Sequence, residues 1–245
     1  MVTLQVRTVT FANIEAVIFD KDGTLEDSTD FLRNLAQKRA RLIDAQIPGI
    51  GEPLLMAFGV EGDTLDPTGL MAVGSRRENE IAAAAYIAET GRGWLESLNI
   101  ARRAFEDADH YLKSRPPSPL FIGCLEILKF LCDTGVKVGI LSAAPTSDVE
   151  RFVKYHQLQP YIHFYQGVDE GPSKPDPILL LNVCKALKVN PSATLMVGDA
   201  QGDIDMALAS QSAGCIGICW NTSRPNPLKG ADVIISQLDE IKVLV

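Results

Sequence analysis

The stretch "IEAVIFDKDGTLEDS", residues Ile14–Ser28, decides how the rest of the chain is interpreted. Its apolar run Ala16–Phe19 is typical of a strand buried on both faces of a parallel sheet. The run stops at Asp20 and Asp22, two acids separated by a single residue. Carboxylates this close repel each other unless a positive group lies between them. The stretch therefore predicts a buried strand that ends beside a cation.

Four further apolar runs have the same character as the first. They are short, rich in Val and Ile, and bounded by Gly, Asp or Ser: Val136–Leu141, Leu195–Val197, Ile216–Cys219 and Val233–Ile235. Between most of them, apolar residues recur at helical spacing, in Ile122–Asp133, Ser147–His156, Pro177–Leu187 and Ile204–Ser210. Alternating strands and helices predict an α/β fold, with a Rossmann-like parallel sheet core flanked by helices. The pattern "LQVRTV" leaves open whether residues 1–13 add a further strand.

The segment between the first two predicted strands breaks this alternation. It contains no convincing strand from Asp27 to Arg115, and its pattern predicts helices over Phe31–Ala45, Glu78–Thr90 and Gly93–Lys113. We therefore predict two domains. Residues 1–26 and 116–245 form the α/β core, and residues 27–115 form an inserted α-helical cap domain.

Composition excludes several classes of protein. The 245 residues are 46% hydrophobic and 22% charged, as expected for a packed globular chain. The net charge of −8 and the lack of a Lys/Arg-rich run argue against nucleic acid as a partner. No apolar stretch approaches the ~18 residues that span a membrane, and the N-terminus lacks the apolar segment of a secretory signal. Five scattered cysteines fit buried thiols in a reducing compartment, so we expect a cytoplasmic protein with no membrane partner. The oligomeric state is not predicted.

Polar side chains that could bind a ligand or take part in catalysis follow the ends of the predicted strands, where ligands bind in parallel sheets. These residues are Asp20, Asp22, Thr24, Ser142, Lys174, Asp199 and Asp203. Several carboxylates beside one lysine favour a hard cation, and Mg²⁺ prefers oxygen ligands and often binds substrate phosphate as well. We predict Mg²⁺ between Asp20 and Asp199, with Lys174 providing positive charge for an anionic substrate.

Four segments carry a family resemblance: "FDKDGTL", "GILSAAP", "SKPDP" and "VGDAQGD", in that order. The chain resembles the haloacid dehalogenase superfamily, in particular its phosphatase branch with a helical cap inserted after the first core strand, as in phosphoglycolate phosphatases. The resemblance covers roughly residues 14–25 and 116–240. It implies a Mg²⁺-dependent phosphatase that acts on a small phosphorylated metabolite, such as phosphoglycolate or a sugar phosphate.

The resemblance also implies a role for each matching residue. Asp20 is expected to be the nucleophile that forms an aspartyl-phosphate, and Asp22 the general acid and then the general base. Four residues are implied in metal binding: Asp20, Asp22 through its backbone carbonyl, Asp199 as a direct ligand, and Asp203 in support of the metal shell or of Lys174. The residues implied to hold the phosphoryl group are Ser142, Ala143, Gly23, Thr24 and Lys174.

Some positions leave alternatives open. Lys21 stands where the family usually has an apolar residue, and strand alternation predicts that it points away from its neighbours. Ala143 stands where the family often has a polar residue, but its N–H is still available. Asp203 could instead cap a helix that starts at Ile204. In the insert, Arg76 and Arg77 could bind a substrate carboxylate or second phosphate, or could simply be solvated.

Two other functions remain as alternatives. A phosphomutase of the same family would keep this core and protect the aspartyl-phosphate from water. A non-catalytic binding protein could use the same fold, although it would have no need for so many acids beside a lysine. Asp22 favours an oxygen leaving group, because a departing halide needs no proton.

Overall fold

The computed structural model describes residues 1–113, 116–220 and 228–244. The chain forms two compact units: a core unit of Met1–Asp27 with Pro119–Val245, and a helical unit of Ser28–Ser118. The boundaries predicted from the sequence differ from these by one residue at the first junction and three at the second. Arg115, the last residue of the predicted insert, lies outside the described residues. The action of the helical unit as a cap stays a prediction.

Six strands of the described core unit form a parallel sheet in the order β10-β9-β8-β3-β6-β7. Their bounds are β3 Ala16–Phe19, β6 Lys137–Leu141, β7 Phe164–Gln166, β8 Thr194–Gly198, β9 Gly214–Ile218 and β10 Val233–Ile235. The predicted α/β fold is confirmed, and all five predicted strands are present. Strand β7 was not predicted, because its three residues are only half-buried and one is polar.

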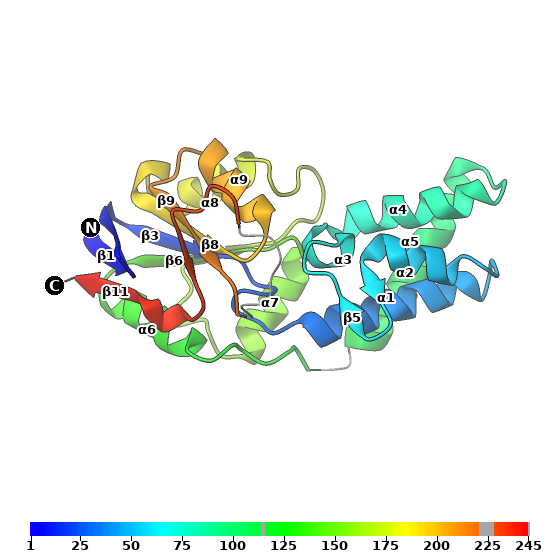
Figure 1. The fold of residues 1–245 in the computed structure, drawn as a ribbon, viewed down its shortest axis with the longest axis horizontal. Coiled ribbons are helices and arrows are strands. Elements are labelled where there is room, and N and C mark those ends of the chain that lie inside the picture. Colours follow the sequence, from blue (N-terminus) through cyan, green and yellow to red (C-terminus); the bar gives the residue numbers. More distant parts are fainter. Residues whose placement is uncertain (114–115, 221–227, 245) are drawn as a thin grey trace. The chain divides into compact units, whose positions relative to one another are not determined.

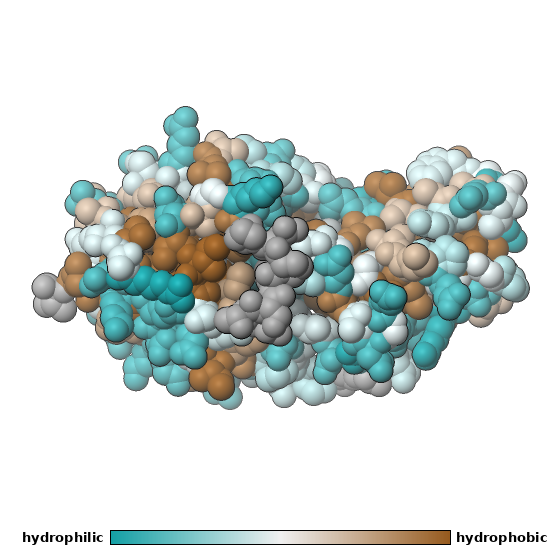
Figure 2. Space-filling view, viewed as in Figure 1, coloured by the Kyte–Doolittle hydropathy of each residue, from teal (hydrophilic) through white to brown (hydrophobic). Residues whose placement is uncertain are grey.

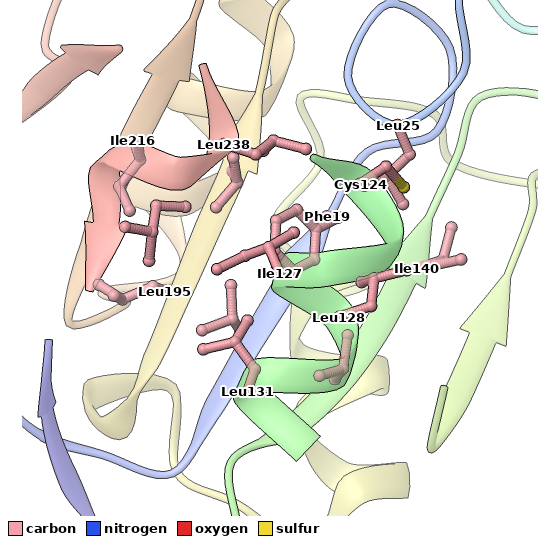
Figure 3. Packing of buried hydrophobic residues seen from close by; sticks show 14 of the residues in the cluster. Phe19, Leu25, Cys124, Ile127, Leu128, Leu131, Ile140, Leu195, Ile216 and Leu238 are labelled. Carbon is pink, nitrogen blue, oxygen red and sulfur yellow. The ribbon is translucent and has the colours of Figure 1, made fainter. Parts of the chain in front are cut away.

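Helices cover both faces of this sheet (Figure 1), and their bounds are α6 Cys124–Asp133, α7 Thr146–Tyr155, α8 Ile178–Leu187 and α9 Gln201–Ala209. Successive side chains of β3 point to opposite faces of the sheet, so the strand packs against helices on both sides. Val17 and Phe19 belong to the cluster that includes residues of α6 and α7, whereas Ala16 and Ile18 pack with residues of α8 and α9. Figure 3 shows the first cluster, in which α6 side chains such as Leu128 pack toward Phe19 and the sheet.

A second, antiparallel sheet joins the two ends of the core unit. Its strands are β1 Val2–Val6, β2 Val9–Ile14 and β11 Ile241–Leu244, in the order β11-β1-β2. Residues 1–13 therefore form most of a hairpin, which answers the question left open by the sequence. The described part of this unit also contains two short 3-10 helices, Pro191–Ala193 and Leu238–Glu240.

The helical unit contains α1 Thr29–Asp44, α2 Gly51–Phe58, α3 Leu70–Val73, α4 Arg76–Glu89 and α5 Trp94–Lys113. The three helices expected from the sequence correspond to α1, α4 and α5. The expectation of no strand is wrong in one detail, since β4 Val60–Glu61 and β5 Thr64–Leu65 form a small hairpin. Two residues per strand are too few to show alternation. The unit has its own core, in which the rings of Phe58 and Phe105 pack edge to face with their centroids 6.3 Å apart.

Hydrophilic residues cover much of the visible surface of each unit, and apolar residues form patches among these hydrophilic residues (Figure 2). Among the described residues, no helix combines the length and apolar character required to cross a membrane. The five cysteines are free thiols, and Cys124, Cys184 and Cys215 are buried.

Candidate active site

Strand order brings the predicted residues together. Strand β3 lies between β8 and β6, with Phe19 paired to Val197 on one side and to Ile140 on the other. The carboxyl ends of these three parallel strands therefore meet at one edge of the sheet. Asp20 follows β3, Ser142 follows β6 and Asp199 follows β8.

A buried ion-pair centre lies at this edge. The Lys174 ammonium is 2.6 Å from Asp20 Oδ1 and 2.7 Å from Asp203 Oδ1. The three side chains are 6%, 9% and 0% exposed, so solvent screens their charges weakly. Burial lowers the pKa of Lys174, but the charges of Asp20 and Asp203 outweigh it and raise this pKa above its usual range. Lys174 is therefore a fixed positive charge.

Three carboxylates form a candidate cation site beside this lysine. Asp20, Asp199 and Asp203 each offer an oxygen, and these oxygens all lie within 4.8 Å of one another. Burial raises the pKa of Asp20 well above its ordinary value. The positive charge of Lys174 acts to lower this pKa, whereas the neighbouring carboxylates raise it further. A cation among these oxygens would stabilise the ionised form of Asp20. An all-oxygen, carboxylate-rich donor set fits a hard divalent ion such as Mg²⁺.

The turn after β3 is closed by its own backbone. The Lys21 carbonyl accepts the N–H groups of Thr24, Leu25 and Glu26 at 3.3, 2.9 and 2.9 Å. Gly23 has φ +76°, and a Cβ at this position would lie 2.4 Å from Asp199 Oδ2. The turn therefore requires glycine both for its backbone conformation and for its close approach to Asp199.

Two predicted phosphate contacts on this turn have other partners. The Gly23 N–H, expected to face phosphate, donates to the Glu26 carbonyl at 2.9 Å, because the turn folds back on itself. The Thr24 hydroxyl donates to Asp199 Oδ1 at 3.2 Å, so Thr24 links the turn to the carboxylate cluster.

Asp22 and Ser142 face each other across the site. The Ser142 hydroxyl lies 3.4 Å from Asp22 Oδ2 and accepts the Ala144 N–H at 3.1 Å. Ser142 is buried and Ala143 is half-buried. The phosphate-binding roles of Ser142 and Ala143 stay predictions.

Lys21 does not point away from its neighbours, and that prediction is wrong. Its ammonium is 2.6 Å from Asp22 Oδ1 and 2.6 Å from Glu26 Oε2. Strand β3 ends at Phe19, so the alternation of a strand does not extend to Lys21. Sequence reasoning also missed Glu26, which carried only a weak signal as an acid in the loop after the strand.

Asp203 contacts Lys174 and also accepts a backbone N–H at the start of helix α9, but the prediction that it caps a helix starting at Ile204 is wrong. Helix α9 begins at Gln201 and not at Ile204, so Asp203 lies within its first turn. Its Oδ2 accepts the Ala200 N–H at 3.2 Å, while Oδ1 pairs with Lys174. Asp203 therefore ties the start of the helix to the ion-pair centre.

Arg76 and Arg77 begin helix α4 in the helical unit, after a capping box formed by Ser75 and Glu78. Arg76 pairs with Glu80 and, through Nε at 2.9 Å, with Asp109. Arg77 is half-exposed and lies 3.7 Å from Glu80. The structure thus places Arg76 in an ion-pair network within its own unit, and a substrate role for either arginine stays a prediction.

A parallel sheet that gathers buried acids and a lysine beyond its central strand is typical of an enzyme site. Residues 14–211 match the family model described as haloacid dehalogenase-like hydrolase. The chain belongs to this family of hydrolases, as its sequence motifs predicted.

Relatives of known name point to one branch of the family. Phosphoglycolate phosphatase 1 of Pseudomonas aeruginosa is 28% identical over 236 residues, covering 92% of this chain and 77% of the relative. Phosphoglycolate phosphatase of Vibrio vulnificus is 26% identical over 227 residues, covering 91% of this chain and 92% of the relative. The predicted resemblance to the phosphatase branch is confirmed.

A solved structure supports the fold. The beta-phosphoglucomutase of Clostridium difficile superposes with a TM-score of 0.65 at 19% identity, covering 94% of this chain and 93% of the other. This likeness concerns the fold alone, since one fold supports several reactions.

Proposed function

We propose that this chain is a Mg²⁺-dependent phosphatase that hydrolyses a small phosphomonoester through an aspartyl-phosphate on Asp20. The buried Lys174–Asp20 pair beside two further carboxylates carries the proposal. A nucleophilic carboxylate with a fixed lysine and a cation-binding donor set suits phosphoryl transfer, which depends mainly on positioning and charge neutralisation. The names of the relatives make 2-phosphoglycolate the first substrate to test.

The first step is transfer of the phosphoryl group to the protein. An Asp20 carboxylate oxygen attacks phosphorus, and the bond from phosphorus to the ester oxygen breaks. Asp22 donates a proton to the departing oxygen, which leaves as an alcohol. Lys174, the Ser142 hydroxyl and the Ala143 N–H stabilise the negative charge on the transferring group.

The second step releases phosphate. Asp22, now ionised, accepts a proton from a water molecule as that water attacks phosphorus. The bond from phosphorus to Asp20 breaks, so inorganic phosphate leaves and the Asp20 carboxylate is restored. Asp22 ends the cycle protonated, ready for the next substrate.

The residues that would hold Mg²⁺ are Asp20, Asp199, Asp203 and the backbone carbonyl of Asp22. When bound, the ion would neutralise negative charge on the carboxylates and on the transferring phosphoryl group.

Phosphate release from a panel of phosphomonoesters, with Mg²⁺ and with chelator, tests this proposal. We expect metal-dependent release by the wild-type chain and a loss of at least about 10³-fold in Asp20→Asn. Asp133→Asn is a matched control, because Asp133 is exposed at the end of α6 and lies outside the site.

Other outcomes contradict the proposal in different ways. Isomerised phosphosugar without net release of phosphate would support a phosphomutase. A folded chain that binds Mg²⁺ but converts no ester would support a binding role.

A further inference from the structure

Lys21 is a buried lysine that the proposed reaction does not use. Its ammonium lies between Asp22 Oδ1 and Glu26 Oε2, 2.6 Å from each. The side chains of Lys21 and Glu26 are 7% and 6% exposed, and the Phe152 ring centroid lies 5.6 Å from the ammonium. A lysine bound on two sides in a buried position has little freedom to move, so its partners are held as well.

The two oxygens of Asp22 have different partners. Oδ1 accepts from Lys21, whereas Oδ2 faces the Ser142 hydroxyl at 3.4 Å. Ser142 follows β6, on the side where the transferring group is proposed to bind. The contact with Lys21 therefore holds the carboxylate with Oδ2, and not Oδ1, toward Ser142, beside the proposed position of the phosphoryl group.

Glu26 is itself held firmly. Its N–H donates to the Lys21 carbonyl and its own carbonyl accepts the Gly23 N–H, both at 2.9 Å. It also forms a bridge to Leu120, on the returning segment of the core unit. Glu26 thus anchors the Lys21 ammonium to a hydrogen-bonded part of the turn. Because the same ammonium contacts Asp22, the position of the Asp22 carboxylate is restricted as well.

We propose that Lys21 is a positioning residue that, anchored by Glu26, orients Asp22 for proton transfer through Oδ2. The inference rests on the proposed function. The proton moves from Asp22 Oδ2 to the ester oxygen as the bond from phosphorus to that oxygen breaks. In the second step, the same Oδ2 takes a proton from the attacking water. A misoriented Asp22 slows both transfers but leaves the attack by Asp20 intact.

The dependence on the leaving group tests this role. Lys21→Met removes the ammonium and keeps an unbranched side chain. The double variant Lys21→Met/Glu26→Gln also removes the buried carboxylate that the first change leaves without its ammonium partner. We expect kcat/KM for 2-phosphoglycolate, whose alkoxide must be protonated, to fall by about tenfold to a hundredfold in both variants. For p-nitrophenyl phosphate, whose leaving group needs little protonation, the fall stays within about threefold.

Each outcome has a definite meaning once circular dichroism has shown a folded variant. Lys129→Met, at an exposed position of α6, should change neither substrate's kcat/KM. Equal losses on both esters in the double variant, or no loss on either, would overturn the role of Lys21 while the wild-type activity upholds the phosphatase. Wild-type chain that releases phosphate from neither of these esters nor from any other ester of the panel would overturn the proposed function itself, and this role with it.

Discussion

At the scale of single residues, two buried lysines each form ion pairs with two of the acids at the carboxyl edge of the sheet. Lys174 pairs with Asp20 and Asp203, and Lys21 pairs with Asp22 and Glu26. Asp199 adds a further carboxylate, so the acids outnumber the lysines and negative charge remains in excess. This excess supports the proposal that a divalent cation binds at the site.

Removing the Lys174 charge tests its place in the site. Lys174→Met should lower kcat/KM for phosphomonoesters by about 10²- to 10³-fold, because the transferring group loses a fixed positive charge in a buried position. Lys185→Met, at an exposed position of α8, is the matched control and should keep full activity. An active Lys174→Met variant would show that the lysine serves only the fold. Steady-state kinetics of the three proteins decides between these results.

Gly23→Ala tests the close approach of the turn to Asp199. Any Cβ at this position meets the Asp199 carboxylate, so the side chain must move and Mg²⁺ affinity should fall at least about tenfold. Gly135→Ala is a precise match for the backbone, since Gly135 has φ +80° but nothing within 4 Å of its added Cβ. Both variants should lose about 1 kcal/mol of stability from the left-handed backbone. Isothermal titration with Mg²⁺ separates them, and equal affinities would contradict the proposed metal site.

The candidate site could largely be predicted from sequence because strand ends are easy to recognise. Asp20 and Asp199 follow apolar runs, and parallel strands carry such residues to one edge. The arrangement of Lys21 could not be predicted, because the alternation used for it stops at Phe19, where the strand ends. The link from Lys21 to Glu26 depends on a turn whose backbone geometry leaves no periodic pattern.

At the scale of secondary-structure elements, the small sheet β11-β1-β2 joins the two ends of the chain. Arg7 follows β1 and pairs with Glu240, just before β11. Glu240 also accepts the Ser236 and Gln237 N–H groups at 2.7 and 3.1 Å. The hydrogen bond from Arg7, together with these backbone donors, lowers the pKa of Glu240 from 4.5 to about 2, although burial acts to raise it.

This pKa shift predicts how stability depends on pH. A depressed pKa in the folded state stabilises the fold above pH 4.5, and that contribution is lost as pH falls from 4.5 towards 2. Glu240→Gln should cost about 1 kcal/mol at pH 7 and less at pH 3. Urea unfolding at the two pH values measures this difference. A cost that is the same at both would show that the charge of Glu240 contributes nothing.

The elements that could not be predicted from the sequence have two physical causes. Strand β7 has three half-buried residues, and β4 and β5 have two each, so none is long enough to show a period. Helix α2 lies in a Gly- and Pro-containing segment, where such residues usually mark turns. Long elements with one buried face, such as α1 and α6, were predicted to within about two residues.

At the scale of the whole molecule, the two units have separate hydrophobic cores, and every proposed metal ligand belongs to the core unit. Leu54→Ala removes a fully buried side chain from the helical unit and should destabilise it by about 3 kcal/mol. Mg²⁺ affinity at low temperature should remain within about twofold of wild type, because the ligands are unchanged. Met56→Ala, at an exposed position of the same helix, is the control for unfolding. A large loss of Mg²⁺ affinity in folded Leu54→Ala would contradict this division of roles.

The central claim is that Asp20 carries the phosphoryl group, and trapping that group tests it most directly. Asp22→Asn lacks the general base, so its aspartyl-phosphate should persist when p-nitrophenyl phosphate and Mg²⁺ are supplied. Acid quenching, peptic digestion and mass spectrometry should find one added phosphoryl group on the peptide that contains Asp20. Asp20→Asn should carry none. Turnover by the wild-type chain with no modified peptide at any quench time, in either the wild type or Asp22→Asn, would contradict the account.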